Sequence, residues 1–321
     1  MVSFDSVLRN IAAVFASLFL STVSAAAFES GRLDFSLEIN GDSSDYHAFF
    51  SVALPGESVS VRILQGAGKG VYQAQLDERL LSAQAPGRWS FAAPSRPGYS
   101  KLKVWRAGGK PMHITLFTLV PASKVRNGVL NNYRIGTYPK TPYKGLAEYM
   151  PPKGFIEVSE EARSLKLSPH FTLGQFLCKQ ESAYPKYLVL RPRLLLKLEG
   201  LLADVNARGV RADSFTVMSG YRTPYYNALI KNVENSRHLW GGAADIFIDA
   251  DPVDNLMDDI NGDGRTTKAD ALQLYQWADR YVKKYARPDL VGGVGAYGST
   301  ASHGPFVHID VRGQRARWGA N

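Results

Sequence analysis

The sequence predicts an α+β protein in which a small all-β part precedes a larger mixed part. The chain has 321 residues, which is long enough for two domains. Between residues 28 and 122, short alternating runs are separated by turn residues, a pattern typical of a small β-sandwich. From about residue 169 onward, helix-length apolar stripes alternate with short strand-like runs, which indicates a mixed domain.

The alternation in the first part is clearest in residues 33–39 and 59–63, where apolar side chains fall on every second position, and it continues in 114–120 with Thr118 in place of one apolar residue. Breaks such as Pro55-Gly56 separate these runs. The region carries no cluster of His, Cys or acidic residues, so we interpret residues 28–122 as a β-rich binding or spacer module. Residues 123–168 are punctuated by prolines, and we expect an ordered but irregular connecting segment there.

The mixed part, residues 169–321, contains six predicted elements. Helices are expected over 192–208 and 267–285, with a short helix from Thr223 to Ile230, and strands over 215–218, 243–248 and 306–311. Pro192 near the start of the first helix and Gly209 just beyond its end fit the usual boundary signals of a helix.

Residues 1–27 are predicted to be an export signal. Arg9 supplies an early positive charge, an apolar run extends from Ile11 to Val23, and three alanines at 25–27 offer a signal-peptidase site. The run is too short and too rich in small residues for a membrane span, although an uncleaved anchor is the alternative. We therefore expect an exported protein of the periplasm or cell envelope, with no stable membrane span after signal removal.

Composition narrows the possible partners. Cys178 is the only cysteine, so no internal disulfide forms, and its apolar neighbours indicate a buried side chain rather than a nucleophile. The formal net charge of +9 favours anionic surfaces such as cell-wall polymers or lipid headgroups. A generic basic surface is the alternative. No nucleic-acid partner is expected, because no nucleic-acid-binding motif accompanies the charge.

Three segments of the mixed part suggest a metal site: SGYRTP at 219–224, SRHLWGGAAD at 236–245 and HGPFVHID at 303–310. The glycine-rich bend between His238 and Asp245 allows an imidazole and a carboxylate to reach one point. His308, on a later strand, would complete a site of two histidines and one carboxylate. Three protein ligands leave a fourth position for water, which is typical of catalytic zinc. For each histidine alone, a hydrogen-bonded core position is the alternative.

These segments resemble the zinc D-Ala-D-Ala carboxypeptidases and murein endopeptidases, which share the hedgehog/DD-peptidase fold. The resemblance rests on S-G-Y-R, S-x-H-x-x-G-x-A-x-D and a late histidine-bearing strand, and it covers the C-terminal half only. It implies an antiparallel sheet with flanking helices, zinc bound by His238, Asp245 and His308, and hydrolysis of peptidoglycan peptide stems as a D,D-carboxypeptidase or endopeptidase. A non-catalytic, zinc-containing cell-wall-binding protein is the alternative.

The resemblance also implies roles in substrate binding. Arg222 would hold a substrate carboxylate or carbonyl oxygen, for which a guanidinium is well suited, with an ion pair inside the turn as the alternative. Tyr221 and Ser236 would help to position the substrate.

The general base is less clearly marked. Family members carry a glutamate three residues, or a histidine two residues, before the last zinc histidine, where this chain has Pro305 and Phe306. The remaining candidates for proton transfer are His303 and Asp310. If its strand is extended, Asp310 lies on the same face as His308 and is alternatively a partner that orients a zinc ligand.

A second ion site is predicted in the loop from 259 to 270. Oxygen-bearing side chains stand at loop positions 1, 3 and 5, and Gly264 stands at position 6, where a sharp turn is needed. The predicted calcium ligands are Asp259, Asn261, Asp263, the backbone carbonyl of Arg265, and Asp270. We expect a structural calcium ion that clamps this insertion; an ion-free polar turn is the alternative.

Overall fold

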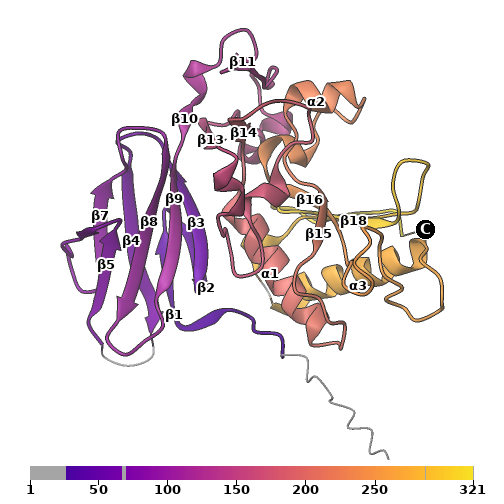
Figure 1. Cartoon of the computed structure of the whole chain (residues 1–321), viewed down its shortest axis with the longest axis horizontal. Helices are drawn as coiled ribbons and strands as arrows, with labels where there is room; N and C mark the ends of the chain where they lie inside the picture. The colour runs from indigo at the N-terminus through magenta and orange to yellow at the C-terminus, as the bar shows by residue number, and fades with distance from the viewer. Residues whose placement is uncertain (1–26, 67–69, 286, 321) are drawn as a thin grey trace, which may run out of the picture.

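The computed structural model describes residues 27–66, 70–285 and 287–320, so the predicted export signal lies outside the described residues except for Ala27. The protein is mixed α and β, with many strands and few helices. Figure 1 shows an all-β part beside a mixed part that contains the long helices. None of the described helices has the length and apolar character needed to cross a membrane.

The all-β part consists of two stacked sheets (Figure 1). One has the order β2-β1-β4-β7 and the other β3-β9-β8-β5-β6. Their bounds are β1 Arg32–Ile39, β2 Asp42–Tyr46, β3 Ala48–Ala53, β4 Ser58–Gly66, β5 Tyr72–Leu76, β6 Arg79–Leu80, β7 Arg88–Ala92, β8 Gly98–Arg106 and β9 Met112–Thr118. The alternation predicted for residues 33–39 is confirmed, because Phe35, Leu37 and Ile39 are buried on one face of β1.

The segment over 123–168 is more regular than expected. It holds β11 (Val129–Leu130), β12 (Tyr133–Arg134) and β13 (Gly154–Val158). β13 pairs antiparallel with β10 (Val120–Pro121) on one side and with β14 (Lys186–Leu188) on the other. This small sheet joins the two parts of the chain, and its apolar residues Phe155 and Ile156 are buried.

The mixed part is built on a sheet of order β15-β16-β18-β17-β19. The strands are β15 Thr216–Ser219, β16 Ala243–Phe247, β17 Gly293–Tyr297, β18 Phe306–Asp310 and β19 Ala316–Trp318. All pairs are antiparallel except β17–β19, which is parallel, so the expectation of an antiparallel sheet fails at this edge.

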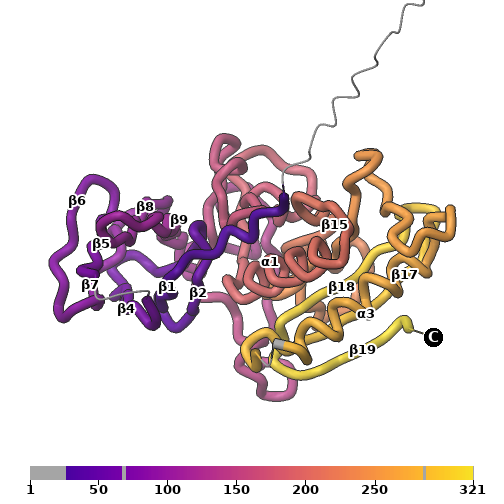
Figure 2. Tube along the Cα trace, turned by 90° about the horizontal axis from the view of Figure 1, so that it is seen from below, coloured from indigo at the N-terminus to yellow at the C-terminus, as the bar shows by residue number. Residues whose placement is uncertain are grey.

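Three α-helices accompany this sheet: α1 Pro192–Asn206, α2 Pro224–Leu229 and α3 Lys268–Tyr285. The predicted helices are confirmed, with ends shifted by one or two residues. Figure 2 shows α3 running along β17 and β18, and α1 packs against α3. Ile246, Val307 and Ile309 are buried on one face of the sheet, so the residues that alternate with them along β16 and β18 lie on the opposite face.

Short 3-10 helices complete the chain: η1 Ala122–Lys124, η2 Tyr143–Gly145, η3 Ala147–Tyr149, η4 Glu161–Ser164, η5 Leu173–Phe176, η6 Arg237–Trp240 and η7 Pro288–Leu290. The two parts of the chain share one apolar core, since buried residues of the sandwich and of α1 belong to the same cluster. An ion pair between Arg193 of α1 and Asp42 of β2, with 3.4 Å between Nε and Oδ1, lies at the same boundary.

Candidate metal centre

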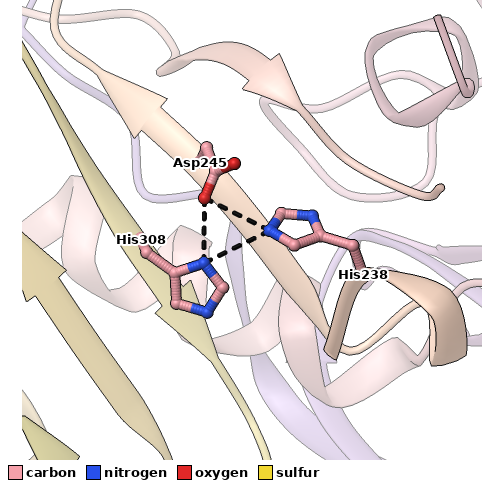
Figure 3. Close-up of side chains that lie close together, drawn as sticks. All are labelled: His238, Asp245 and His308. Atoms are coloured by element: carbon pink, nitrogen blue, oxygen red, sulfur yellow. Dashed lines mark hydrogen bonds and ion pairs between the residues drawn. The ribbon is translucent and has the colours of Figure 1, made fainter. Parts of the chain in front are cut away.

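The three predicted ligands come together on two adjacent strands and the short helix before them. Asp245 of β16 lies directly opposite His308 of β18 in the antiparallel register. His238 lies in η6, which ends at Gly241 in a left-handed conformation with φ of 61°. A Cβ at Gly241 would also lie 2.1 Å from the carbonyl oxygen of Val189, so the bend requires glycine. Figure 3 shows the three side chains pointing toward one another.

Their distances match those of ligands that share one ion. His238 Nε2 lies 3.2 Å from both Asp245 Oδ1 and His308 Nδ1, and His308 Nδ1 lies 2.8 Å from Asp245 Oδ1 (Figure 3). Ligand atoms at about 2.0–2.1 Å from a tetrahedral ion are about 3.3 Å apart. Within the described ranges of the chain, this is the one group of His, Cys, Asp and Glu side chains close enough to hold a metal ion, and all three residues are buried.

The other polar atom of each ligand is bonded to the protein. Nδ1 of His238 donates to the carbonyl oxygen of Gly220 at 2.6 Å, and Nε2 of His308 donates to Asp310 Oδ2 at 3.1 Å. Asp245 Oδ2 accepts from Nη2 of Arg222 at 2.6 Å. These contacts fix both imidazole rings and leave His238 Nε2, His308 Nδ1 and Asp245 Oδ1 facing a common point, as in metal sites whose ligands are oriented by a surrounding layer of hydrogen bonds. The three side chains could therefore hold a metal ion.

The electrostatics of the three ligands agree with this arrangement. Burial lowers the pKa of His238, which favours the neutral imidazole that binds a metal. Burial alone would raise the pKa of Asp245, but the imidazoles of His238 and His308 hold that pKa well below its usual range. Burial opposes a charged His308, yet hydrogen bonds to Asp245 and Asp310 raise the pKa of this histidine. The buried carboxylate of Asp245 thus stays ionised between two imidazoles. Its negative charge would partly offset the positive charge of a cation bound there.

Asp310 orients a ligand. It is fully buried; its Oδ1 accepts from the backbone N–H of Gly293 at 2.8 Å, and its Oδ2 accepts from Nη2 of Arg312 at 2.5 Å. Burial opposes ionisation, but His308 and Arg312 hold the pKa of Asp310 far below its usual range. Both oxygens of Asp310 already accept hydrogen bonds, from Gly293, His308 and Arg312. The geometry thus argues against Asp310 as the general base and favours the alternative, a partner that orients His308.

His303, the other candidate base, lies outside the three-ligand group. Its Nδ1 donates to the carbonyl oxygen of Gly304 at 2.8 Å, and its ring contacts Phe306 edge to face. The residue is partly buried in the loop before β18 and lines a cavity on the side of Phe247 and Pro305. Its catalytic role stays a prediction.

The residues expected to bind substrate take different positions. Arg222 is 8% exposed; it donates to Ser219 Oγ within the turn and pairs with Asp245 on β16, and its role in substrate binding stays a prediction. Tyr221 is 1% exposed, and its hydroxyl lies 2.8 Å from that of Tyr138. The expectation that Tyr221 positions substrate is therefore not supported, because its side chain is in the core. Ser236 is buried just before η6, and its role stays a prediction.

Four contributors to the site were missed from the sequence. Gly293 and Gly295 of β17 lie opposite Asp310 and His308 and lack the side chains that would collide there. A Cβ at Gly293 would lie 2.3 Å from Asp310 Oδ2, and one at Gly295 would lie 2.2 Å from the Trp318 ring. Trp318 packs beside His308, with 5.2 Å between ring centroids, and Arg312 pairs with Asp310. The signal in the sequence that could have revealed them is the pair Gly293 and Gly295, two glycines one residue apart in the segment before His308.

The predicted calcium loop is folded but does not gather its carboxylates around one point. Asp259 Oδ1 accepts from the N–H groups of Gly262 and Asp263, and Gly264 adopts the left-handed conformation expected at position 6. Both oxygens of Asp270 accept backbone N–H groups of the loop, including that of Thr267. In the described ranges, the loop carboxylates do not form a second converging group. Calcium binding therefore stays a prediction.

Comparison with known proteins adds no assignment: no protein-family model matches the sequence, and no curated protein matches it. The functional argument consequently depends on the geometry described above.

Proposed function

We propose that this chain is an exported zinc-dependent peptidase that hydrolyses peptide bonds in cell-wall peptidoglycan, with a hedgehog/DD-peptidase type of fold in its C-terminal half. The observation that carries the proposal is the buried group of two imidazoles and one carboxylate, whose facing atoms lie 2.8–3.2 Å apart. Two histidines, one carboxylate and an open position form a ligand set of catalytic zinc peptidases. The order of the three sequence segments around this group supports the peptidoglycan substrate.

In this proposal, His238, Asp245 and His308 hold the ion. Bound zinc lowers the pKa of a coordinated water to about 7 and polarises a carbonyl oxygen. Gly220 and Asp310 hold the two imidazoles in the tautomers that leave His238 Nε2 and His308 Nδ1 unprotonated. Arg222 binds the second oxygen of Asp245, so that one oxygen stays directed at the ion. His303 remains the candidate for moving a proton between the attacking water and the amine leaving group.

A non-catalytic zinc-containing wall-binding protein is the second candidate. The observation that favours it is that both candidate bases are already hydrogen-bonded within the protein. Asp310 accepts from Arg312, and His303 donates to the carbonyl oxygen of Gly304. The two candidates share the same metal centre and differ only in turnover.

Digestion of isolated peptidoglycan sacculi by the purified protein tests the proposal. We expect soluble muropeptides to be released by the zinc-loaded protein, to vanish with a chelator and to return when zinc is restored. His238→Ala should abolish release, whereas the same change at His113, an exposed histidine of the sandwich, should not. Zinc retention without any released product would instead support the wall-binding candidate.

A further inference from the structure

The sheet face that carries the metal ligands continues into a cavity. Phe247 and Phe306 each lie two residues along the strand from a ligand, Asp245 and His308 respectively, and therefore on the same face of the sheet. Two residues of extended strand span about 7 Å. At this position a cavity of about 280 Å³ opens, and its lining residues come from β15, the end of β16, the loops around 255–257 and 302–305, and Lys179 in the segment after η5.

The size and position of the cavity suit one residue of a bound peptide. Its volume is slightly below the roughly 300–1,000 Å³ of typical small-molecule sites, so it is too small for an extended chain. A peptide in extended conformation advances about 3.3–3.6 Å per residue. Because Phe247, which lines the cavity, is about 7 Å along β16 from Asp245, the cavity corresponds to a position one or two residues from a bond cut at the metal.

The lining combines apolar walls with one cation. Met218, Phe247 and Met257 contribute apolar surface, and Lys179 is the only charged side chain apart from any charge on His303. No carboxylate lines the cavity, and no ion pair to Lys179 is found among the residues that the structure describes. By contrast, the cavity around Tyr184 and Tyr225 is lined by both Arg134 and Glu181, so its charges offset each other.

We infer that this cavity is a substrate subsite for a residue that bears a free carboxylate on an aliphatic stem, with Lys179 as the residue that determines specificity. This inference rests on the proposed function. The ammonium of Lys179 is a compact charge that attracts a carboxylate, and no acid in the lining competes for it. The apolar walls contact the stem. In peptidoglycan, the carboxylate is supplied either by the C-terminus of the stem peptide or by the side chain of an acidic diamino residue.

Binding and turnover of matched synthetic stem peptides test this subsite. Four peptides are compared: one pair with the C-terminus as acid or amide, and one pair with the side-chain carboxylate of the diamino residue free or amidated. Calorimetry on the metal-free full chain measures binding, and turnover is measured on the zinc-loaded protein. The variants are Lys179→Met, Lys179→Arg and, as the matched control, Lys124→Met at an exposed lysine outside the cavity.

The acid form of one pair should bind about tenfold more tightly than its amide, the factor expected for one charge-assisted contact. The pair that shows this difference identifies the source of the carboxylate. Lys179→Met should remove the difference and raise KM with little change in kcat, while Lys179→Arg and Lys124→Met should keep it. Equal binding of acid and amide by the unaltered protein, or a difference that survives in Lys179→Met, would overturn the inference. Binding that prefers the acid, without turnover, would support the subsite and refute the peptidase proposal. Turnover without any preference for the acid would support the peptidase proposal and refute the subsite.

Discussion

At the scale of single residues, the metal centre depends on side chains that would not touch the ion. Asp310 fixes the ring of His308, and Arg222 occupies one oxygen of Asp245. Both side chains are buried and charged. Asp310 is hydrogen-bonded to His308 and Arg312, and Arg222 is hydrogen-bonded to Asp245. A buried charge is tolerated in a protein only when it is paired and hydrogen-bonded. Their positions are therefore explained by the ligands that they orient.

Replacing Asp310 by Asn tests this orienting role. The amide keeps the shape of the side chain but removes the negative charge that holds His308 Nε2–H. We expect zinc affinity, measured by competition with a chromophoric chelator, to fall by roughly 10–100-fold, the usual cost of losing such a partner. Asp213→Asn, the same change at an exposed carboxylate, should leave affinity unaltered. An unchanged affinity in Asp310→Asn would show that Asp310 does not orient the ligand.

At the scale of elements, β17 makes room for the site. Its glycines face Asp310 and Trp318, so the carboxylate and the indole occupy space that side chains on a strand would normally fill. Trp318 also donates from Nε1 to the hydroxyl of Tyr297 at 2.8 Å, which holds the indole in place beside His308. The edge of the sheet thus supports the metal ligand from one side.

Gly295→Ala should disturb this packing. The added Cβ would lie 2.2 Å from the indole of Trp318, which must then move. We expect a loss of about 1–3 kcal/mol in the free energy of unfolding, the usual range for overpacking, measured by urea denaturation of the metal-free protein. Gly304→Ala, where a Cβ meets nothing within 4 Å, should have little effect. Equal stability of the two variants would contradict the assigned packing.

Elements with a clear period or boundary signal could be predicted from the sequence. The helix from Pro192 is one case, since its apolar stripe and terminal signals are local. The short strand β13 was missed because only its pairing with β10 and β14, both distant along the chain, makes it a strand. The three candidate ligands were found because their spacing is distinctive, and the structure brings them together. The burial of Tyr221 and the partners of Arg222 and Asp310 were not predictable, because they depend on which residues the fold brings opposite each ligand.

At the scale of the whole molecule, the two parts are not independent bodies joined by a loose linker. One apolar core runs from the sandwich to α1, and α1 in turn packs against α3, the helix that contacts β17 and β18. Lys197 of α1 donates to the backbone carbonyl of Asp310 at 2.7 Å, and burial lowers the pKa of this lysine to about 8. The sandwich therefore borders a helix that directly contacts the site.

Metal content with X-ray absorption spectroscopy tests the central claim most directly. The account predicts one zinc ion per chain after reconstitution, bound at about 2.0–2.1 Å by two imidazole nitrogens, one carboxylate oxygen and one further light atom. The triple variant His238→Ala, Asp245→Ala, His308→Ala should bind none. Failure of the unaltered protein to retain zinc, or equal zinc in the triple variant, would contradict the account.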